Sequence, residues 1–271
     1  MRRLLAILAR RLATVLACAT ASALADIPIA RAAPIVAVHA SLHPKIPGRS
    51  TTIGMTIAVS PNGTVVPPSL LAVQVRYPAG LDVQLSGLGI EACSPATLAM
   101  LGPPGCPPDS VMGYGSAIAQ VPIKGEVISE TARLAIVRAA QHDGHLALML
   151  VAYDEPALSA QIVLGAELLP AERPFGGQLA ISVPLVTTFP EGPDMSVTEV
   201  ELALGPRHLR YSERAHGRVV HYEPAGIRLP SRCTRGGYRF AVQLSFAGGE
   251  QASAKTSVPC PRRTLRREAP R

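Results

Sequence analysis

The segment TTIGMTIAVS at residues 51–60, followed by PNG at residues 61–63, is the clearest indication of the fold. Apolar residues occupy every second position from Ile53 to Val59, so they lie on one face of an extended chain. This period of two is typical of a β-strand with one buried face, because successive side chains point to opposite sides of a sheet. The Pro-Asn-Gly sequence that follows is a turn signal. We therefore expect residues 51–60 to form one strand of an antiparallel sheet.

Similar alternation recurs on both sides of this segment, in runs bounded by Pro, Gly or Asn. The sequence QHDG at residues 141–144 separates two of these runs and predicts a hairpin turn. Pro184 falls inside a run and indicates an edge strand or a bulge, since proline cannot donate a backbone hydrogen bond. The predicted strands, in addition to 51–60, are 35–40, 71–77, 81–85, 116–123, 126–139, 145–153, 160–169, 178–187, 197–204, 218–222, 238–246 and 251–258.

One short helix is predicted between two cysteines. Ser94 suits the N-cap position and Pro95 the first helical turn, and the GPPG sequence at residues 102–105 ends the segment. About a dozen strands with one short helix predict an all-β fold. The expected architecture over residues 34–260 is a two-layer, immunoglobulin-like antiparallel β-sandwich with the helix in a disulfide loop. A division into two packed sub-domains, with a break near residues 112–125, is the alternative.

The N-terminus has the pattern of an export signal. Four arginines between residues 2 and 11 precede an apolar run, and Ala23-Leu24-Ala25 fits the small-x-small cleavage rule. We expect residues 1–25 to be a cleaved signal peptide and residues 26–33 to begin the mature chain. The apolar run is too short for a transmembrane anchor, which needs about 20 residues. The alternatives are lipoprotein processing at Cys18, cleavage after Ala32, a twin-arginine signal and an amphipathic helix of the folded protein.

The chain is basic overall, but its charge is unevenly distributed. The formal net charge is +7. The predicted signal peptide carries four Arg and no acid, and residues 261–271 carry five Arg and one Glu. The region between them has 17 basic and 18 acidic residues, so its net charge is close to zero. Nucleic-acid binding by a uniformly basic surface is therefore not expected, and residues 261–271 are interpreted as a basic, disordered tail.

Four cysteines remain once the predicted signal peptide is removed, and an even number is typical of an oxidised compartment. They allow three pairings, and their clustering favours Cys93–Cys106 and Cys233–Cys260. In the chain-entropy model the first bond is worth about 3 kcal/mol, and the second, which closes a longer loop, about 3.6 kcal/mol. A zinc site is not expected, because the chain has no CxxC motif and no histidine at zinc-finger spacing. The sequence predicts neither a metal nor another cofactor.

Three patterns resemble parts of catalytic sites, and each also has a structural explanation. The sequence GYGS at residues 113–116 is not the GxSxG motif, and we expect a glycine-rich turn there. Glu199 and Glu201 alternate with apolar residues, which indicates a solvated sheet face, although this pair or Asp154-Glu155 has the composition of a glycosidase site. The histidines have no spacing that requires a metal, and we expect them at the surface: His142, His145, His208, His216 and His221.

The strongest local charge feature is an arginine-rich segment beyond residue 200. Residues 26–200 contain 8 basic and 14 acidic residues, whereas residues 201–260 contain 9 basic and 4 acidic ones. A cationic face there suits an anionic polymer of the cell envelope or a lipid headgroup. A solvated surface is the alternative, because the chain has 23 Arg and only three Lys. The candidate anion-binding residues are Arg207, His208, Arg210, Arg214 and Arg218.

Short motifs around the cysteines resemble those of a group of secreted bacterial proteins that have no established activity. The resemblance covers most of residues 42–261. It implies a secreted, β-rich protein with two disulfides and brings no site residues. The matching motifs are LGIEAC at 88–93, GCPPDSVMG at 105–113, LPSRC at 229–233, FAGG at 246–249 and VPCP at 258–261.

Together these observations predict an exported, non-enzymatic protein of the cell envelope or extracellular space that acts as a binding or structural module. Its expected partner is an anionic envelope polymer or lipid headgroup, and neither nucleic acid nor a transmembrane anchor is expected. The alternative is an exported hydrolase whose carboxylate or histidine site the sequence does not identify. A deep pocket with converging Asp, Glu or His side chains favours the hydrolase, whereas a smooth sandwich with a basic rim favours the binding module.

Overall fold

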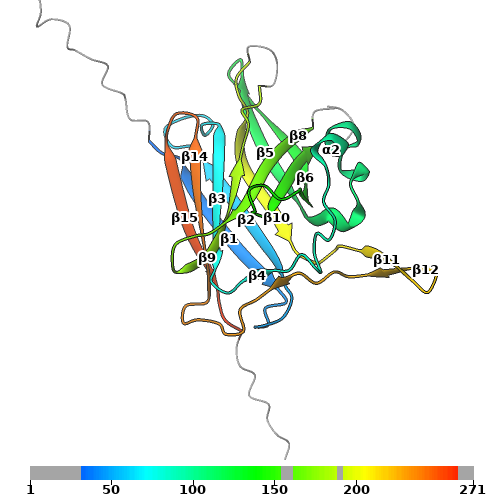
Figure 1. The fold of residues 1–271 in the computed structure, drawn as a ribbon. Helices are drawn as coiled ribbons and strands as arrows, with labels where there is room; N and C mark the ends of the chain where they lie inside the picture. The colour runs from blue at the N-terminus through cyan, green and yellow to red at the C-terminus, as the bar shows by residue number, and fades with distance from the viewer. Residues whose placement is uncertain (1–31, 154–160, 188–191, 262–271) are drawn as a thin grey trace, which may run out of the picture. The chain divides into compact units, whose positions relative to one another are not determined.

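The computed structural model describes residues 32–153, 161–187 and 192–261, which form strands along most of their length (Figure 1). The all-β prediction is confirmed. The predicted signal peptide at residues 1–25, most of residues 26–33 and nearly all of the predicted tail lie outside the described residues. The candidate carboxylate pair Asp154-Glu155 also lies outside them.

The regular elements of the described residues are fifteen strands, one α-helix and two 3-10 helices. Strands β11 and β13 have no counterpart among the predicted strands, whereas the predicted hairpin turn at 141–144 is present. In chain order the elements are β1 (Ile35–His43), β2 (Thr52–Ser60), β3 (Leu70–Pro78), β4 (Asp82–Val83), α2 (Pro95–Leu101), η1 (Pro103–Gly105), η2 (Pro108–Ser110), β5 (Val111–Ile123), β6 (Glu126–Arg138), β7 (Ala147–Tyr153), β8 (Ile162–Leu169), β9 (Phe175–Ser182), β10 (Ser196–Leu204), β11 (Tyr211–Ala215), β12 (Arg218–Tyr222), β13 (Ile227–Arg228), β14 (Tyr238–Phe246) and β15 (Gln251–Val258).

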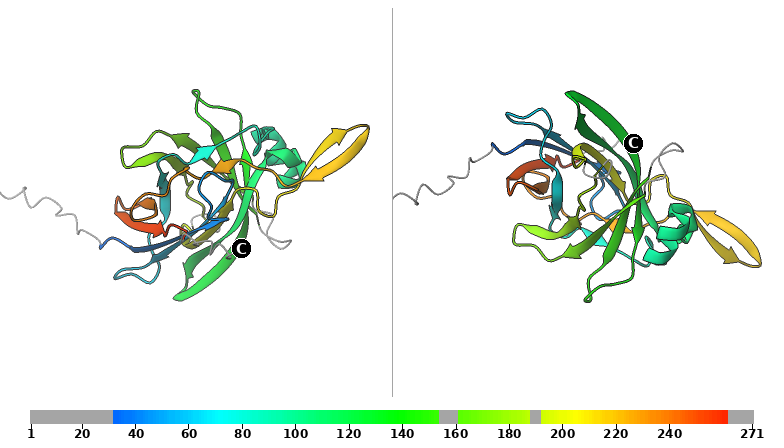
Figure 2. Two further views of the ribbon diagram at one scale, coloured as in Figure 1. Left: turned by 90° about the horizontal axis from the view of Figure 1, so that it is seen from below. Right: turned by 90° about the horizontal axis from the view of Figure 1, so that it is seen from above.

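Eleven of the strands form one continuous antiparallel sheet in the order β1-β2-β10-β5-β6-β7-β8-β9-β3-β14-β15. The sheet curls until its two outer strands, β1 and β15, lie side by side, so that it is nearly closed into a barrel (Figures 1 and 2). The sequence predicts two layers, and the structure instead has opposite walls of one sheet facing each other. Alternation of inward and outward side chains is the same in both architectures, so the pattern of strand pairing is what separates them.

The two ends of the curled sheet carry different connections. The open end, as we call it, has the short turn between β5 and β6 and the connection from β9 to β10. At the base, the other end, the β10–β14 segment carries the β11–β12 hairpin, and the β4–β5 connection leaves the sheet to place α2 beside the outer face of β6 and β7 (Figure 1). Residues 112–125, where one prediction places a break between sub-domains, contain β5 and its turn to β6.

The main hydrophobic core lies on the inner face of the curled sheet, and β14 contributes its largest side chains. Tyr238, Phe240 and Phe246 point inward at alternating positions and are at most 2% exposed. Val242 and Leu244, which complete the same alternation, are equally buried. Because β14 pairs with β3 on one side and β15 on the other, these aromatic rings fill the space between walls that are distant in sequence.

A second, smaller core lies on the outer face of β6 and β7. There Cys93, Leu98 and Cys106 of the β4–β5 connection pack against Val137 and Val151. Where this connection covers them, β6 and β7 are buried on both faces. Burial on both sides explains why the sequence there is continuously apolar rather than alternating.

The helix and the two disulfides agree with the sequence pattern. The Ser94 hydroxyl accepts a hydrogen bond from the Thr97 N–H at 3.0 Å, and Gly102, with a φ of 67°, ends the helix. The disulfides Cys93–Cys106 and Cys233–Cys260 are both present, 13 and 27 positions apart in sequence. The first therefore holds α2 against the outer face of the sheet, and the second joins the segment before β14 to the end of β15.

Candidate functional site

The curled sheet encloses an apolar cavity of about 470 Å³ near its open end. Its walls are inward-facing side chains of seven strands (β3, β5, β6, β7, β8, β9 and β10), so no single sequence segment contains the site. The floor is formed by Leu134 and Leu150, which are buried core residues. The cavity therefore lies directly above the packed inner core, and its lower wall is the top of that core.

Alanines at neighbouring inward positions create this space. Ala117 of β5 lies directly opposite Ala132 of β6, and Ala152 of β7 lies opposite Leu134 of β6. Ala119, two positions beyond Ala117, also faces the cavity. Most other buried positions of the inner core carry a side chain larger than alanine. Three adjacent strands thus present methyl groups where a packed core needs larger side chains.

The connection from β9 to β10 crosses the open end, because these strands lie on opposite walls of the sheet. Val183, Leu185 and Met195 of this connection line the cavity. Backbone hydrogen bonds hold its two described ends, from Val183 N–H to the Leu71 carbonyl at 2.8 Å and from Met195 N–H to the Val186 carbonyl at 2.9 Å. The predicted strand 178–187 therefore ends early, at residue 182, and Pro184 lies in the connection rather than in an edge strand or bulge.

Polar groups are sparse in the cavity. Among the described residues that line it, Glu130 is the one with a formal charge. Glu130 is half-buried and lies opposite Ala119, toward the open end. A carboxylate at the entrance of an apolar space can orient the polar end of a ligand.

The candidate anion-binding residues lie on two neighbouring parts of the chain. Arg207, His208 and Arg210 lie in the loop after β10, whereas Arg214 and Arg218 lie on the β11–β12 hairpin that projects from the base (Figure 1). Together with His221 and Tyr222, His208 and Arg210 border a hollow of about 550 Å³.

The other candidate catalytic residues are spread over the outer surface. The glycine-rich turn predicted at residues 113–116 is wrong, because these residues belong to β5. A side chain at Gly113 or Gly115 clashes with the backbone of β10, so glycine is needed there for close strand pairing. Glu199 and Glu201 lie on the outward positions of β10. On the surface, His142 Nδ1 lies 2.9 Å from Glu167 Oε1. No group of three His, Cys, Asp or Glu side chains suited to a metal occurs in the described part of the chain.

Tyr211 anchors the projecting hairpin to the base. Its hydroxyl donates to the Val111 carbonyl at 2.5 Å and accepts from the Gly89 N–H at 2.9 Å. Its ring meets the ring of Tyr222 edge-on, with 6.1 Å between centroids. Burial raises the pKa of the Tyr211 hydroxyl to about 12, and the hydrogen bond from Gly89 opposes that shift. A buried, neutral hydroxyl thus joins the hairpin to the residues before and at the start of β5.

We expect the protein to lose stability between pH 10 and about 12. A tyrosine whose pKa is raised on folding stabilises the folded state below its unfolded pKa of about 10, and this contribution is lost as the pH rises through the folded pKa. Replacing Tyr211→Phe removes both hydrogen bonds at neutral pH, at a cost of about 1–3 kcal/mol, and reduces the alkaline loss. Urea unfolding at pH 7 and pH 11 measures both effects. An alkaline loss of full size in Tyr211→Phe means that other groups cause it.

In the described residues, no helix is long and apolar enough to cross a membrane. Comparison of the chain with protein-family models, with curated proteins and with solved structures finds no match.

Proposed function

We propose that this protein is an exported, non-enzymatic binding module that holds an apolar small molecule inside its curled sheet. The observation that carries the proposal is the cavity of about 470 Å³ whose lining is almost entirely aliphatic. Pockets that bind small molecules are concave, mainly apolar and supplied with a few polar groups that fix orientation. The aliphatic walls and the single carboxylate of Glu130 have this composition.

The cavity volume indicates the size of the ligand. A cavity of about 150 Å³ in a protein core accommodates one benzene molecule. A space of about 470 Å³ is three times larger and lies within the range of about 300–1,000 Å³ typical of small-molecule sites. We therefore expect a ligand of two or three fused rings, or a short acyl chain, rather than a polymer.

The energetic cost of the cavity supports the presence of an occupant. Inward-facing apolar side chains around an open space forgo the packing contacts that a filled core provides. Larger side chains at Ala117, Ala119 and Ala132 are an available remedy, because these positions face the empty space. Alanine at these positions lowers the stability of the fold but leaves space for a ligand, as is common at functional sites.

Two features of the chain support export: its predicted signal peptide and its disulfides. The predicted signal peptide at residues 1–25 directs the chain out of the cytoplasm. The two disulfides, Cys93–Cys106 and Cys233–Cys260, are compatible with an oxidising compartment. A location in the cell envelope or outside the cell follows from the same proposal.

The lining of the cavity favours binding over hydrolysis. A glycosidase needs two carboxyl groups about 5–10 Å apart, whereas the described lining contains Glu130 as its one carboxylate. Glu199 and Glu201 lie on the outer face of β10, away from the cavity. The exported hydrolase is therefore the less supported of the two predictions.

A neutral fluorescent probe tests the proposal directly. We expect N-phenyl-1-naphthylamine to bind the purified protein with a 1:1 stoichiometry and to brighten as it leaves water, because its rings match the apolar cavity in size. Fluorescence titration gives the affinity, and mass spectrometry of a solvent extract identifies any apolar molecule that co-purifies. Non-saturating fluorescence and an empty extract together contradict the proposal.

A further inference from the structure

One wall of the curled sheet carries positive charge and no acid. Strands β9, β3, β14 and β15 are neighbours in the sheet, and none of them contains Asp or Glu. The same four strands contain Arg76, Arg239 and Lys255. The opposite wall differs, because β10 carries Glu199 and Glu201 at outward positions. The two outer walls therefore differ in charge, although the net charge of residues 26–260 is close to zero.

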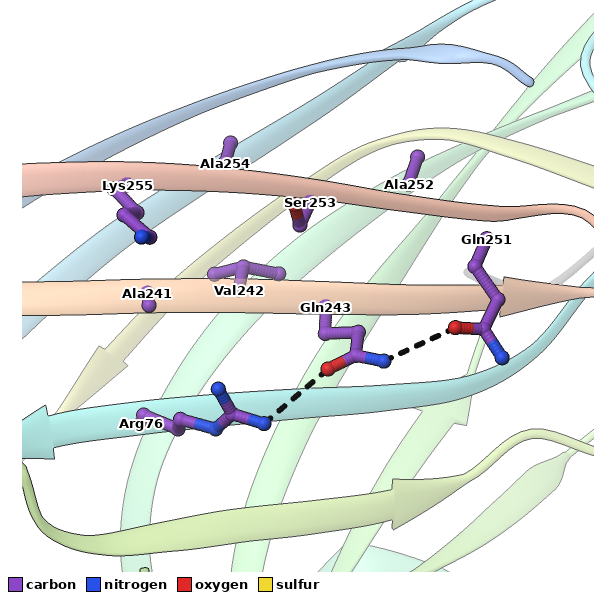
Figure 3. A pocket seen from close by; sticks show the side chains of 9 residues that line it. All are labelled: Arg76, Ala241, Val242, Gln243, Gln251, Ala252, Ser253, Ala254 and Lys255. Carbon is purple, nitrogen blue, oxygen red and sulfur yellow. Dashed lines mark hydrogen bonds between the residues drawn. The ribbon is translucent and has the colours of Figure 1, made fainter. Parts of the chain in front are cut away.

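Two of these cations lie on either side of a groove in the outer surface. Arg76 of β3 and Lys255 of β15 are both paired with Ala241 of β14, so the three residues form one row across three strands. With strands about 4.8 Å apart, the two cationic residues are about 10 Å apart at the backbone. Ala241, whose side chain is small, lies between them and lines the groove (Figure 3). The resulting groove has a volume of about 330 Å³.

Hydrogen bonds between side chains order the residues that line the groove. Arg76 Nη2 donates to Gln243 Oε1 at 3.3 Å, and Gln243 Nε2 donates to Gln251 Oε1 at 3.2 Å (Figure 3). This chain crosses β3, β14 and β15, and it restricts the guanidinium while leaving its other N–H groups available. Ser253 adds a hydroxyl beside Gln243. Side chains that are ordered before binding lose less entropy when a ligand arrives.

We propose that this groove binds an anionic polysaccharide. Arg76 and Lys255 match carboxylate or phosphate groups, and the glutamine and serine side chains between them match sugar hydroxyls. No outward-facing residue of β3, β14 or β15 is aromatic, and single-stranded nucleic acid is held mainly by stacking on aromatic rings. A polymer can extend along the acid-free wall beyond the groove.

The groove and the apolar cavity are independent sites. Val73 of β3 points inward and lines the cavity, whereas Arg76 of the same strand points outward and lines the groove. The polysaccharide proposal therefore goes beyond the proposed binding of an apolar molecule, and either can fail without the other. It also assigns anion binding to residues other than those of the arginine-rich segment.

The parent protein for the test is the full-length chain with the five arginines of residues 262–271 replaced by glutamine. Each variant is made in this parent. Polygalacturonate is the probe, and neutral dextran is the control polymer. We expect Arg76→Gln with Lys255→Gln to weaken polygalacturonate binding about tenfold or more and to reduce its salt dependence. The matched variant Arg207→Gln with Arg210→Gln and Arg214→Gln should bind as the parent does. Unchanged naphthylamine binding, or an unchanged unfolding midpoint, shows that each variant is folded.

Three results overturn the proposal. They are the absence of polygalacturonate binding by the parent protein, equal binding by the Arg76/Lys255 variant, and loss of binding in the arginine-segment variant alone. Competition by single-stranded DNA at equal charge concentration, as strong as that by polygalacturonate itself, also contradicts recognition of a sugar polymer.

Discussion

Replacing Ala117→Phe is expected to abolish binding of the apolar probe, with a loss of affinity of about 100-fold or more. Ala117 lies in the wall of the cavity, between Val200 of β10 and Ala132 of β6. A phenylalanine ring at this inward position occupies the space that the ligand needs. Fluorescence titration with N-phenyl-1-naphthylamine measures the loss.

The same substitution has a second expected effect that separates a blocked cavity from a damaged fold. Filling an apolar void removes part of its energetic cost, so Ala117→Phe should unfold at the same or a higher urea concentration than the parent. Ala132→Phe provides an independent test from the neighbouring strand. A matched control is Ala37→Phe, which places the same ring on the exposed outer face of β1. Unchanged probe affinity in both inward variants means that the ligand does not occupy this cavity.

Much of the secondary structure could be predicted because it depends on local patterns. The strand at residues 51–60 follows from alternation, and the helix follows from Ser94, Pro95 and Gly102. The starts of other strands were harder to place, since β5 begins at residue 111, before the first clear alternation. Gly113 and Gly115 suggest a turn in isolation, yet here they let the backbone of β10 approach closely. A glycine selected for close approach and one selected for a turn are identical in sequence.

The cavity could not be predicted, because it depends on which strands become neighbours. Ala117 and Ala132 face each other only after β5 pairs with β6 in one register, and β10 closes the other side. An inward alanine in a single strand is compatible with a filled core, in which a larger neighbour compensates for it. The cationic groove has the same origin, since Arg76 and Lys255 are distant in sequence and meet only across Ala241. Sheet pairing, rather than composition, therefore determines both proposed sites.

Removing the Cys93–Cys106 disulfide is expected to destabilise the protein more than removing Cys233–Cys260. Loop entropy alone predicts the opposite order, with costs of about 3 and 3.6 kcal/mol, because the second bond closes the longer loop. Burial reverses this order. Cys93 and Cys106 are only 1% and 6% exposed and belong to the small core on β6 and β7, whereas Cys233 and Cys260 are half-buried at the end of the sheet.

Loss of the first bond therefore frees the segment that covers Val137 and Val151. The protein then loses both the loop constraint and the burial of apolar surface in the small core. The double variants Cys93→Ser with Cys106→Ser and Cys233→Ser with Cys260→Ser give the comparison in urea unfolding. A larger loss in the Cys233/Cys260 variant means that loop length outweighs the small core. The first variant should also weaken the apolar probe's binding, because Val151 supports from outside the same strand that places Ala152 at the cavity. The disulfide loop thereby stabilises the wall of the proposed binding site, although it contributes no residue to its lining.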